Sequence, residues 1–246
     1  MIQDILTVMW KERKGLLSYR GSRLRGAMML LIPALIAVIL PLKIGEGFAG
    51  SPLVLILPFI VPVRIIAATI PDSFAGERER HTLETLLASR LSDRAILFGK
   101  IATPVVFAWI VLAGAHTLAL TVFNVAHWNG SLQVHPPTIL LGVVGFGLLL
   151  PLVVAGLGVI ISLRAATLQG AAQLLGTILM PMIVLPLVGA VVVIGGRDQI
   201  ETVIEALETA NWTAVLAVVL AVLLVVAVLF LTTAMARFQR TRLILD

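Results

Sequence analysis

The stretch AVLAVVLAVLLVVAVLFL, residues Ala214–Leu231, decides the fold of this chain. Every residue in it is apolar, and its length fits the roughly 17–25 residues that a helix needs to cross a bilayer. It lacks the alternation of two faces that a membrane barrel strand requires. An isolated segment in lipid must satisfy its own backbone hydrogen bonds, so we expect a transmembrane helix here.

The composition extends this prediction to the whole chain. Of the 246 residues, 59% are hydrophobic and only 13% are charged, and the mean hydropathy is +1.08. A globular domain in water carries about 45–50% apolar and about 25% charged residues. The apolar excess must face lipid, which indicates an all-α polytopic membrane protein and excludes a soluble one.

Six stretches are long enough to span a hydrocarbon core of about 30 Å. The six predicted helices cover Gly26–Ile44, Pro52–Phe74, Ile101–Ala126, Pro137–Leu163, Gly170–Ile194 and Trp212–Ala236. We interpret the first as a retained helix, because no clean signal-peptide cleavage site follows it. The predicted organisation is therefore an N-terminal segment, residues 1–25, followed by a transmembrane domain, residues 26–246.

The basic residues predict the orientation. Fifteen of the 18 lie before the first span, after the second, after the fourth or after the sixth, while the opposite loops hold only Lys43 and Arg197. The positive-inside rule then puts both termini in the cytoplasm, as for a protein of the cell (inner) membrane. These charges flank apolar spans rather than forming a basic stripe with aromatic residues, so we do not expect nucleic-acid binding.

The N-terminal segment predicts an amphipathic helix at the membrane interface. Its apolar side chains recur at helical spacing and a basic flank follows them. The apolar positions are Ile2, Ile5, Leu6, Met9 and Trp10, and the flank is Lys11, Arg13 and Lys14. Such a helix would lie in the inner leaflet boundary, either as an anchor alone or also in contact with a cytoplasmic partner.

The segment Asp72–Lys100 is too patterned for a simple turn. Leu83 and Leu87 share a helical face with Leu86, and the remaining positions are densely charged with mixed sign. A helix of this kind suits docking into a groove of another protein. The alternative is a solvated surface helix, in which the leucines would lack a place to pack. Ser92 predicts the cap of a second short helix through Leu97.

A further helix is expected between spans five and six. Ile200, Val203, Ile204 and Leu207 recur at helical spacing, with glutamates on the other faces. We expect it to rest on the outer leaflet.

The loop resembles one family. Its sequence FAGERERHTLETLL, residues 74–87, is followed by Arg94 and by Phe98-Gly99-Lys100. This is similar to the pattern G-E-R-E-x-G-T-L-E-x-L-L and then G-K in the ABC-2 type permeases, the membrane subunits of ABC transporters. His81 stands where the family usually has glycine, and Ser89-Arg90 replaces a common residue-proline pair.

The resemblance implies a mechanism. Glu77–Ala88 would be a coupling helix seated on a separate cytoplasmic ATPase subunit, with Glu77, Arg78, Leu83, Glu84 and Leu87 as contacts. It also implies a homodimer or heterodimer of permease subunits around the substrate path, and export as the direction. A haem-exporter-type subunit of cytochrome c maturation shares the six-span plan and stays open as an alternative.

Motifs for chemistry within the chain are missing from the sequence. No G-x-x-x-x-G-K-[ST] phosphate loop occurs, so ATP would be bound and hydrolysed by the partner, and we expect no cofactor in this chain. No H-E-x-x-H or G-x-S-x-G motif is present, and His127 with His135 would make a poor metal site. We therefore expect neither a catalytic nor a metal site, and no enzyme activity.

Arg64 is the one basic residue deep within a predicted span. A charge at this depth must face protein, water or an anion rather than lipid. It would pair with Asp72 or with backbone carbonyls freed by Pro58 and Pro62, or else line the substrate path. A proton- or sodium-driven carrier, or a channel, acting without an ATPase is the rival function, but arginine stays charged and cannot relay protons.

Overall fold

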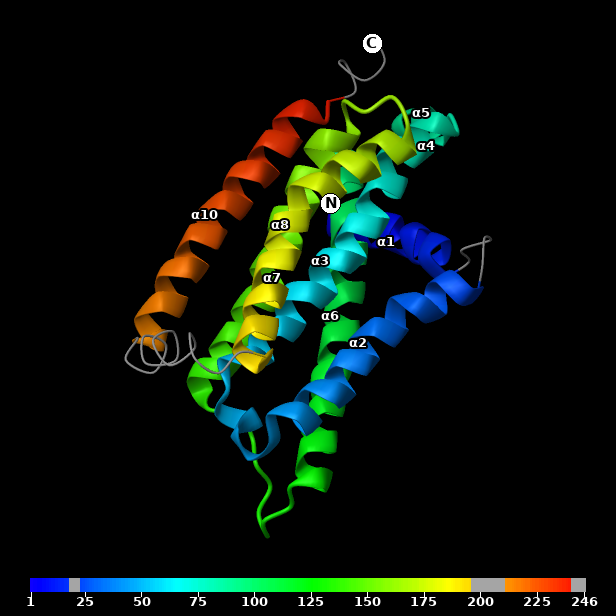
Figure 1. Cartoon of the computed structure of the whole chain (residues 1–246). Coiled ribbons are helices and arrows are strands. Elements are labelled where there is room, and N and C mark those ends of the chain that lie inside the picture. Colours follow the sequence, from blue (N-terminus) through cyan, green and yellow to red (C-terminus); the bar gives the residue numbers. More distant parts are fainter. Residues whose placement is uncertain (18–22, 196–210, 240–246) are drawn as a thin grey trace.

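The computed structural model describes residues 1–17, 23–195 and 211–239, and every regular element in these ranges is helical (Figure 1). The elements in chain order are α1 (Ile2–Leu17), α2 (Arg23–Ile44), η1 (Gly45–Gly50), η2 (Pro52–Leu55), α3 (Ile56–Pro71), η3 (Asp72–Gly76), α4 (Glu77–Glu79), α5 (Thr82–Leu87), α6 (Asp93–Ala126), α7 (Pro137–Ser162), α8 (Leu168–Gly195) and α10 (Trp212–Arg237). The all-α prediction is thus confirmed for the described residues.

Five segments among the described residues are long and apolar enough to cross a membrane. They are Leu30–Gly50, Pro52–Glu79, Asp93–Ala126, Pro137–Ser162 and Trp212–Arg237. They match the predicted spans one, two, three, four and six. The fifth predicted span coincides with α8, a helix of 28 residues, and its passage through the bilayer stays a prediction. The predicted outer helix at residues 200–208 lies outside the described residues.

The core lies where α3, α6 and α7 meet. α2 packs on α6, α8 packs on α3 and α7, and α10 packs on α7 at the edge (Figure 1). Glycines of α7 allow these close approaches. A Cβ atom added at Gly156 would lie 2.8 Å from the Cβ of Phe230, and one at Gly145 would lie 2.6 Å from a methyl carbon of Leu220. α10 therefore seats directly on the backbone of α7.

Two predicted boundaries are wrong. The short helix expected from Ser92 to Leu97 and the span expected from Ile101 form one continuous helix, α6, of 34 residues. The Ser92 cap itself is confirmed, because its Oγ accepts a hydrogen bond from the Ala95 N–H at 3.3 Å. The single helix expected over Glu77–Ala88 is broken into α4 and α5, since His81 has a left-handed backbone with φ of 55°.

Candidate functional site

The sequence E-R-E-R, residues 77–80, lies at the end of the bundle where α4 and α5 emerge (Figure 1). Each of its four side chains contacts a different part of the chain. We call these four residues with their contacts the charged junction. Their partners come from α1, α6, the end of α3, the end of α7 and the beginning of α8.

Glu77 meets the N-terminal helix and α6. Its Oε2 lies 2.8 Å from the Lys100 Nζ, and its Oε1 is paired with the Lys11 ammonium. The Lys100 Nζ also lies 3.0 Å from the Glu12 Oε1 and donates to the Ser73 carbonyl oxygen at 2.7 Å. Lys100 is fully buried, and both glutamates are less than a tenth exposed.

This cluster holds two cations and two anions, so it carries no net charge. Because desolvated ions depend on their partners, removing one member of such a group costs about 3–5 kcal/mol. Burial by itself lowers the pKa of Lys11, but its attraction to Glu12 and its contact with Glu77 outweigh this and raise the pKa. The four groups therefore hold α1, α4 and α6 together as one unit.

α1 lies against α6 through a close backbone contact. A Cβ atom added at Gly99 would lie 2.5 Å from the Cβ of Val8, so only glycine fits at this crossing. The opposite edge of α1 exposes Ile2, Leu6 and Trp10, at 73%, 56% and 54%. The predicted apolar face is thus only partly free: one edge of α1 packs on the protein, and the opposite edge exposes a line of apolar side chains.

Arg78 and Glu79 form hydrogen bonds with the ends of two other helices. The Arg78 guanidinium donates to the Leu163 carbonyl oxygen at 3.0 Å and to that of Ser162 at 3.2 Å. The Glu79 Oε2 accepts from the Leu168 N–H at 2.9 Å. Helix ends leave backbone groups without partners, and a cation at a C-terminus with an anion at an N-terminus suits their dipoles. α4 thus caps both α7 and α8.

Arg80 binds back to the end of α3. Its Nη1 lies 3.0 Å from the Asp72 Oδ1, across the single π-helical turn Asp72–Gly76 that joins α3 to α4. A Cβ atom at Gly76 would lie 2.7 Å from that carboxylate oxygen. The glycine of the G-E-R-E pattern thus leaves room for the close contact between Arg80 and Asp72.

α5 follows the junction through a left-handed residue. His81 adopts φ of 55°, a conformation that glycine takes without strain. This explains why the family pattern has glycine at the position. Beyond the turn, Leu83 and Leu87 are buried in the hydrophobic core at 4% and 3% exposure, whereas the Glu84 side chain is exposed.

The predicted contact residues therefore separate into two groups. Glu77, Leu83 and Leu87 are buried within the chain, Arg78 is half-buried, and Glu84 is exposed. The leucines find partners in the chain's own core, which removes the reason for expecting them in another protein's groove. Contact of these five residues with a partner stays a prediction.

Arg64 lies apart from the junction, on an exposed part of α3. Among the described residues we find no ion pair for it, and its expected partner Asp72 is paired with Arg80 instead. α3 is otherwise buried on most of its circumference. The guanidinium thus lies on the surface of the single chain.

Sequence reasoning missed the roles of Glu12, Glu79 and Lys100. One signal was available, because Lys100 begins a long apolar span, where an unpaired charge is unfavourable. Glu12 is likewise an acid within a basic flank. Their meeting with Glu77 depends on how α1 folds across α6, which periodicity does not reveal.

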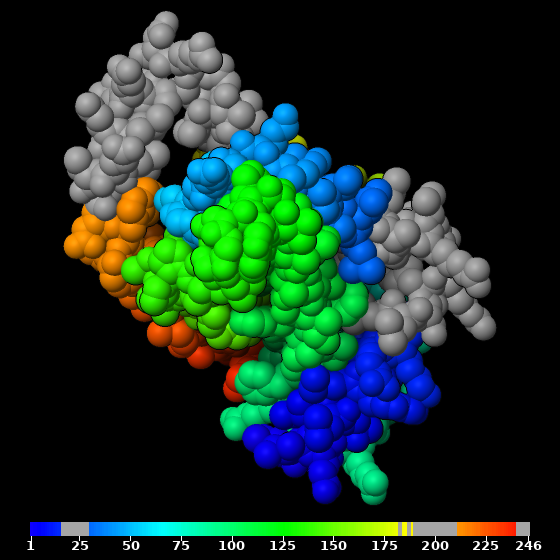
Figure 2. All heavy atoms as spheres, turned by 90° about the horizontal axis from the view of Figure 1, so that it is seen from below, coloured from blue at the N-terminus to red at the C-terminus, as the bar shows by residue number. Residues whose placement is uncertain are grey.

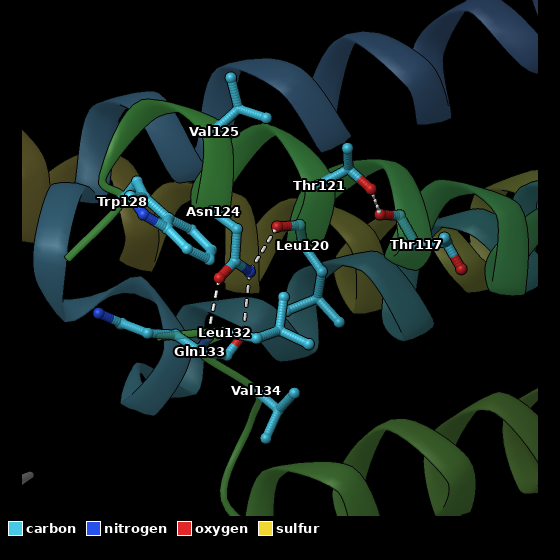
Figure 3. Close-up of a pocket in the computed structure, with 9 residues that line it drawn as sticks. All are labelled: Thr117, Leu120, Thr121, Asn124, Val125, Trp128, Leu132, Gln133 and Val134. Carbon is cyan, nitrogen blue, oxygen red and sulfur yellow. Dashed lines mark hydrogen bonds between the residues drawn. The ribbon is translucent and has the colours of Figure 1, made fainter. Parts of the chain in front are cut away.

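The opposite end of the bundle holds a groove of about 580 Å³ beside the connection from α6 to α7 (Figure 3). Its main polar side chain is internally satisfied, since Asn124 accepts from the Gln133 N–H at 2.8 Å and donates to its carbonyl oxygen at 2.9 Å. No group of three or more metal-ligating side chains occurs among the described residues. The charged junction therefore remains the candidate site.

A comparison with family models matches residues 3–187, three quarters of the chain, to the family described as "ABC-2 type transporter". The matched region contains the whole charged junction, all but the first residue of α1, and α2 to α7. No curated protein matches the chain.

Proposed function

Because this chain belongs to the ABC-2 type transporter family as a membrane permease component, we propose that it is the six-span subunit of an exporter driven by a separate ATPase. α8 supplies the fifth of the six spans in this proposal. Its 28 residues rise about 42 Å at 1.5 Å each, which exceeds a hydrocarbon core of about 30 Å. With six spans and the bias of basic residues, both termini lie in the cytoplasm.

The charged junction carries the proposal. α4 is fixed at once to α1 and α6 by Glu77, to α7 by Arg78 and to α8 by Glu79. A force applied to α5 is therefore delivered to four helices, α1, α6, α7 and α8, rather than to one loop. Such transmission requires packed helices that can adopt two discrete arrangements.

The ATPase contact is proposed to be the exposed face of α5. Glu84 and its exposed neighbours Thr85 and Ala88 present this face, while Leu83 and Leu87 root the helix in the permease core. The buried Glu77 and the half-buried Arg78 act as internal braces. Of the five contact residues predicted from the sequence, Glu84 then contacts the ATPase, and the other four support α5 from within the permease.

α1 is proposed to lie in the inner leaflet boundary. Its exposed line of Ile2, Leu6 and Trp10 suits the acyl region. The Lys14 Nζ lies 3.6 Å from the centre of the Trp10 ring, and this pairing of a cation with an amphipathic ring supports a position near the headgroups. The helix would then support the junction from the membrane side.

Arg64 is proposed to face the substrate path. Since an exposed arginine within a span cannot face lipid at low cost, the bare part of α3 is expected to lie against a second permease subunit and the water or anionic groups between the two. This supports a dimer, either of two copies or with a related chain.

The test is purification of the tagged chain in mild detergent with identification of bound proteins and assay of ATP hydrolysis. We expect a cytoplasmic ABC ATPase in stoichiometric amount and vanadate-sensitive ATP hydrolysis. A chain that purifies alone from membranes in which it is functional would contradict the proposal and favour a carrier or channel.

A further inference from the structure

Two buried histidines meet at the end of the bundle opposite the charged junction. His116 is on α6, and His135 is in the connection between α6 and α7, with exposures of 9% and 2%. Their ring centres are 4.8 Å apart, and Phe48 of η1 packs edge-on against His135 at 5.5 Å. The function proposed above makes no use of this pair.

Hydrogen bonding fixes the state of His135. Its Nδ1 lies 2.7 Å from the Ala49 carbonyl oxygen, which can only accept, so the Nδ1 carries the proton and the Nε2 has a free lone pair. Neither that Nε2 nor either ring nitrogen of His116 has a partner among the described residues. Buried polar atoms without partners are rare and call for an explanation.

The His135–Ala49 bond joins two separate connections. One, residues 127–136, follows α6, and the other is η1, which follows α2; Figure 2, seen from this end, shows the green connection against the blue η1–η2 segment. The first connection is also held to its own helix by the Asn124–Gln133 pair (Figure 3). That amide does not titrate, so the two anchors differ in their response to pH.

The geometry points to a proton-binding latch: protonation of the His116–His135 pair, from the outer side in the orientation proposed above, releases the connection 127–136 from η1. A charge placed here would lie between aromatic rings, and no carboxylate among the described residues is in ion-pair contact with either ring. The other ionisable groups on these segments are His127, which directly follows α6 and whose ring packs on Phe123, and Glu46 and Lys43, which are exposed. α7 contributes no ionisable residue.

The sign follows from burial. Protonation of His135 adds a proton at Nε2 and leaves the Nδ1–H donor to Ala49 in place, so the closed state is opposed by the cost of a buried charge without an anionic partner. Burial lowers the pKa of His135, and its bond to the Ala49 carbonyl opposes this only in part. A histidine whose folded pKa is depressed stabilises the closed state above the unfolded value of about 6.5. That contribution is lost as the pH falls from there through the folded value. The latch is therefore closed at neutral pH and opens on acidification.

The absence of native cysteine makes a spin-label test clean. Labels are attached at Gly47→Cys, where an added Cβ meets nothing within 4 Å, and at the exposed Ser131→Cys. Distances are measured in lipid nanodiscs at pH 7.5 and pH 5.0. We expect a longer and broader distribution at pH 5.0, its loss in His135→Gln, and its retention in the control His81→Gln. Equal distributions at both pH values, or a pH response that persists in His135→Gln, would overturn the latch.

A second measurement needs no variant. Nitrogen NMR of the histidine rings distinguishes tautomers directly, and the chain has only four histidines. We expect His135 to be neutral at pH 7.5 with its proton on Nδ1, and to titrate below about 6.5. A proton on Nε2, or a charged ring at pH 7, would reject the inference even if the substituted chain failed to fold.

Discussion

Lys100 and Glu77 form an ion pair of 2.8 Å inside the protein, although Lys100 lies within α6 and Glu77 belongs to α4. The lysine is fully buried and the glutamate is 8% exposed. The pair therefore explains why a glutamate after the loop glycine and a lysine before the third span occur together in the family pattern. The same ion pair attaches the loop that carries Glu77 to the helix bundle.

Replacing the buried lysine tests this pair. Lys100→Met leaves Glu12 and Glu77 facing each other, and we expect a loss of about 3–5 kcal/mol of stability. The double variant Lys100→Met/Glu77→Gln keeps the Lys11–Glu12 pair and should recover much of the loss. Thermal unfolding in detergent measures both, with Lys14→Met as the control at an exposed site. Strictly additive losses would contradict a direct pair.

Most of the fold follows from the sequence, and the reason is that lipid imposes strong rules on it. Apolar runs such as Ala214–Leu231 define helices because no other isolated segment satisfies its backbone in a bilayer. The break at His81 escaped prediction, since a left-handed residue is common only for glycine and leaves no periodic signal. The continuity of α6 escaped it too, because charged Arg94 and Lys100 resemble a helix boundary.

The site was predictable only in its location. A charged loop with leucines indicates a docking element, but its residue pattern does not distinguish braces from contacts. Glu77 and Glu84 are both glutamates in one charged segment, so the sequence does not distinguish their roles. In the fold, α1 packs across Gly99 and buries Glu77, whereas Glu84 is exposed.

The crossing of α1 and α6 gives a second prediction. Gly99→Ala places a methyl group where the Val8 side chain lies, so α1 should lift from α6 and its amides should exchange faster. The paired change Val8→Gly should restore much of the protection. Gly114→Ala on the same helix meets open space and is the control. Unchanged exchange in Gly99→Ala would show that α1 is not seated there.

The turn before α5 gives a third prediction. His81→Gly removes the strain of a left-handed residue, about 1–2 kcal/mol, partly offset by the greater freedom of glycine in the unfolded chain. We expect a modest rise in the unfolding midpoint, and a fall for the β-branched His81→Val. The reverse order would mean that the turn is not left-handed.

The exposed arginine of α3 gives a fourth prediction. If Arg64 faces a water-filled path, Arg64→Cys should react with a membrane-impermeant thiol reagent in the assembled transporter. Leu35→Cys on α2, also exposed in the single chain at 48%, should face lipid and stay unreactive. Equal protection of both cysteines would remove Arg64 from the path.

The most direct test of the central claim compares Glu84→Lys with Glu77→Gln by quantitative recovery of the ATPase with the purified permease. We predict that Glu84→Lys loses most of the bound ATPase, because it reverses a charge on the exposed face of α5. Glu77→Gln should keep the ATPase bound but lose nucleotide-driven transport, because it breaks an internal brace. Both variants must elute as folded protein on size exclusion. If Glu77→Gln releases the ATPase while Glu84→Lys retains it, the division into contact surface and buried junction is wrong.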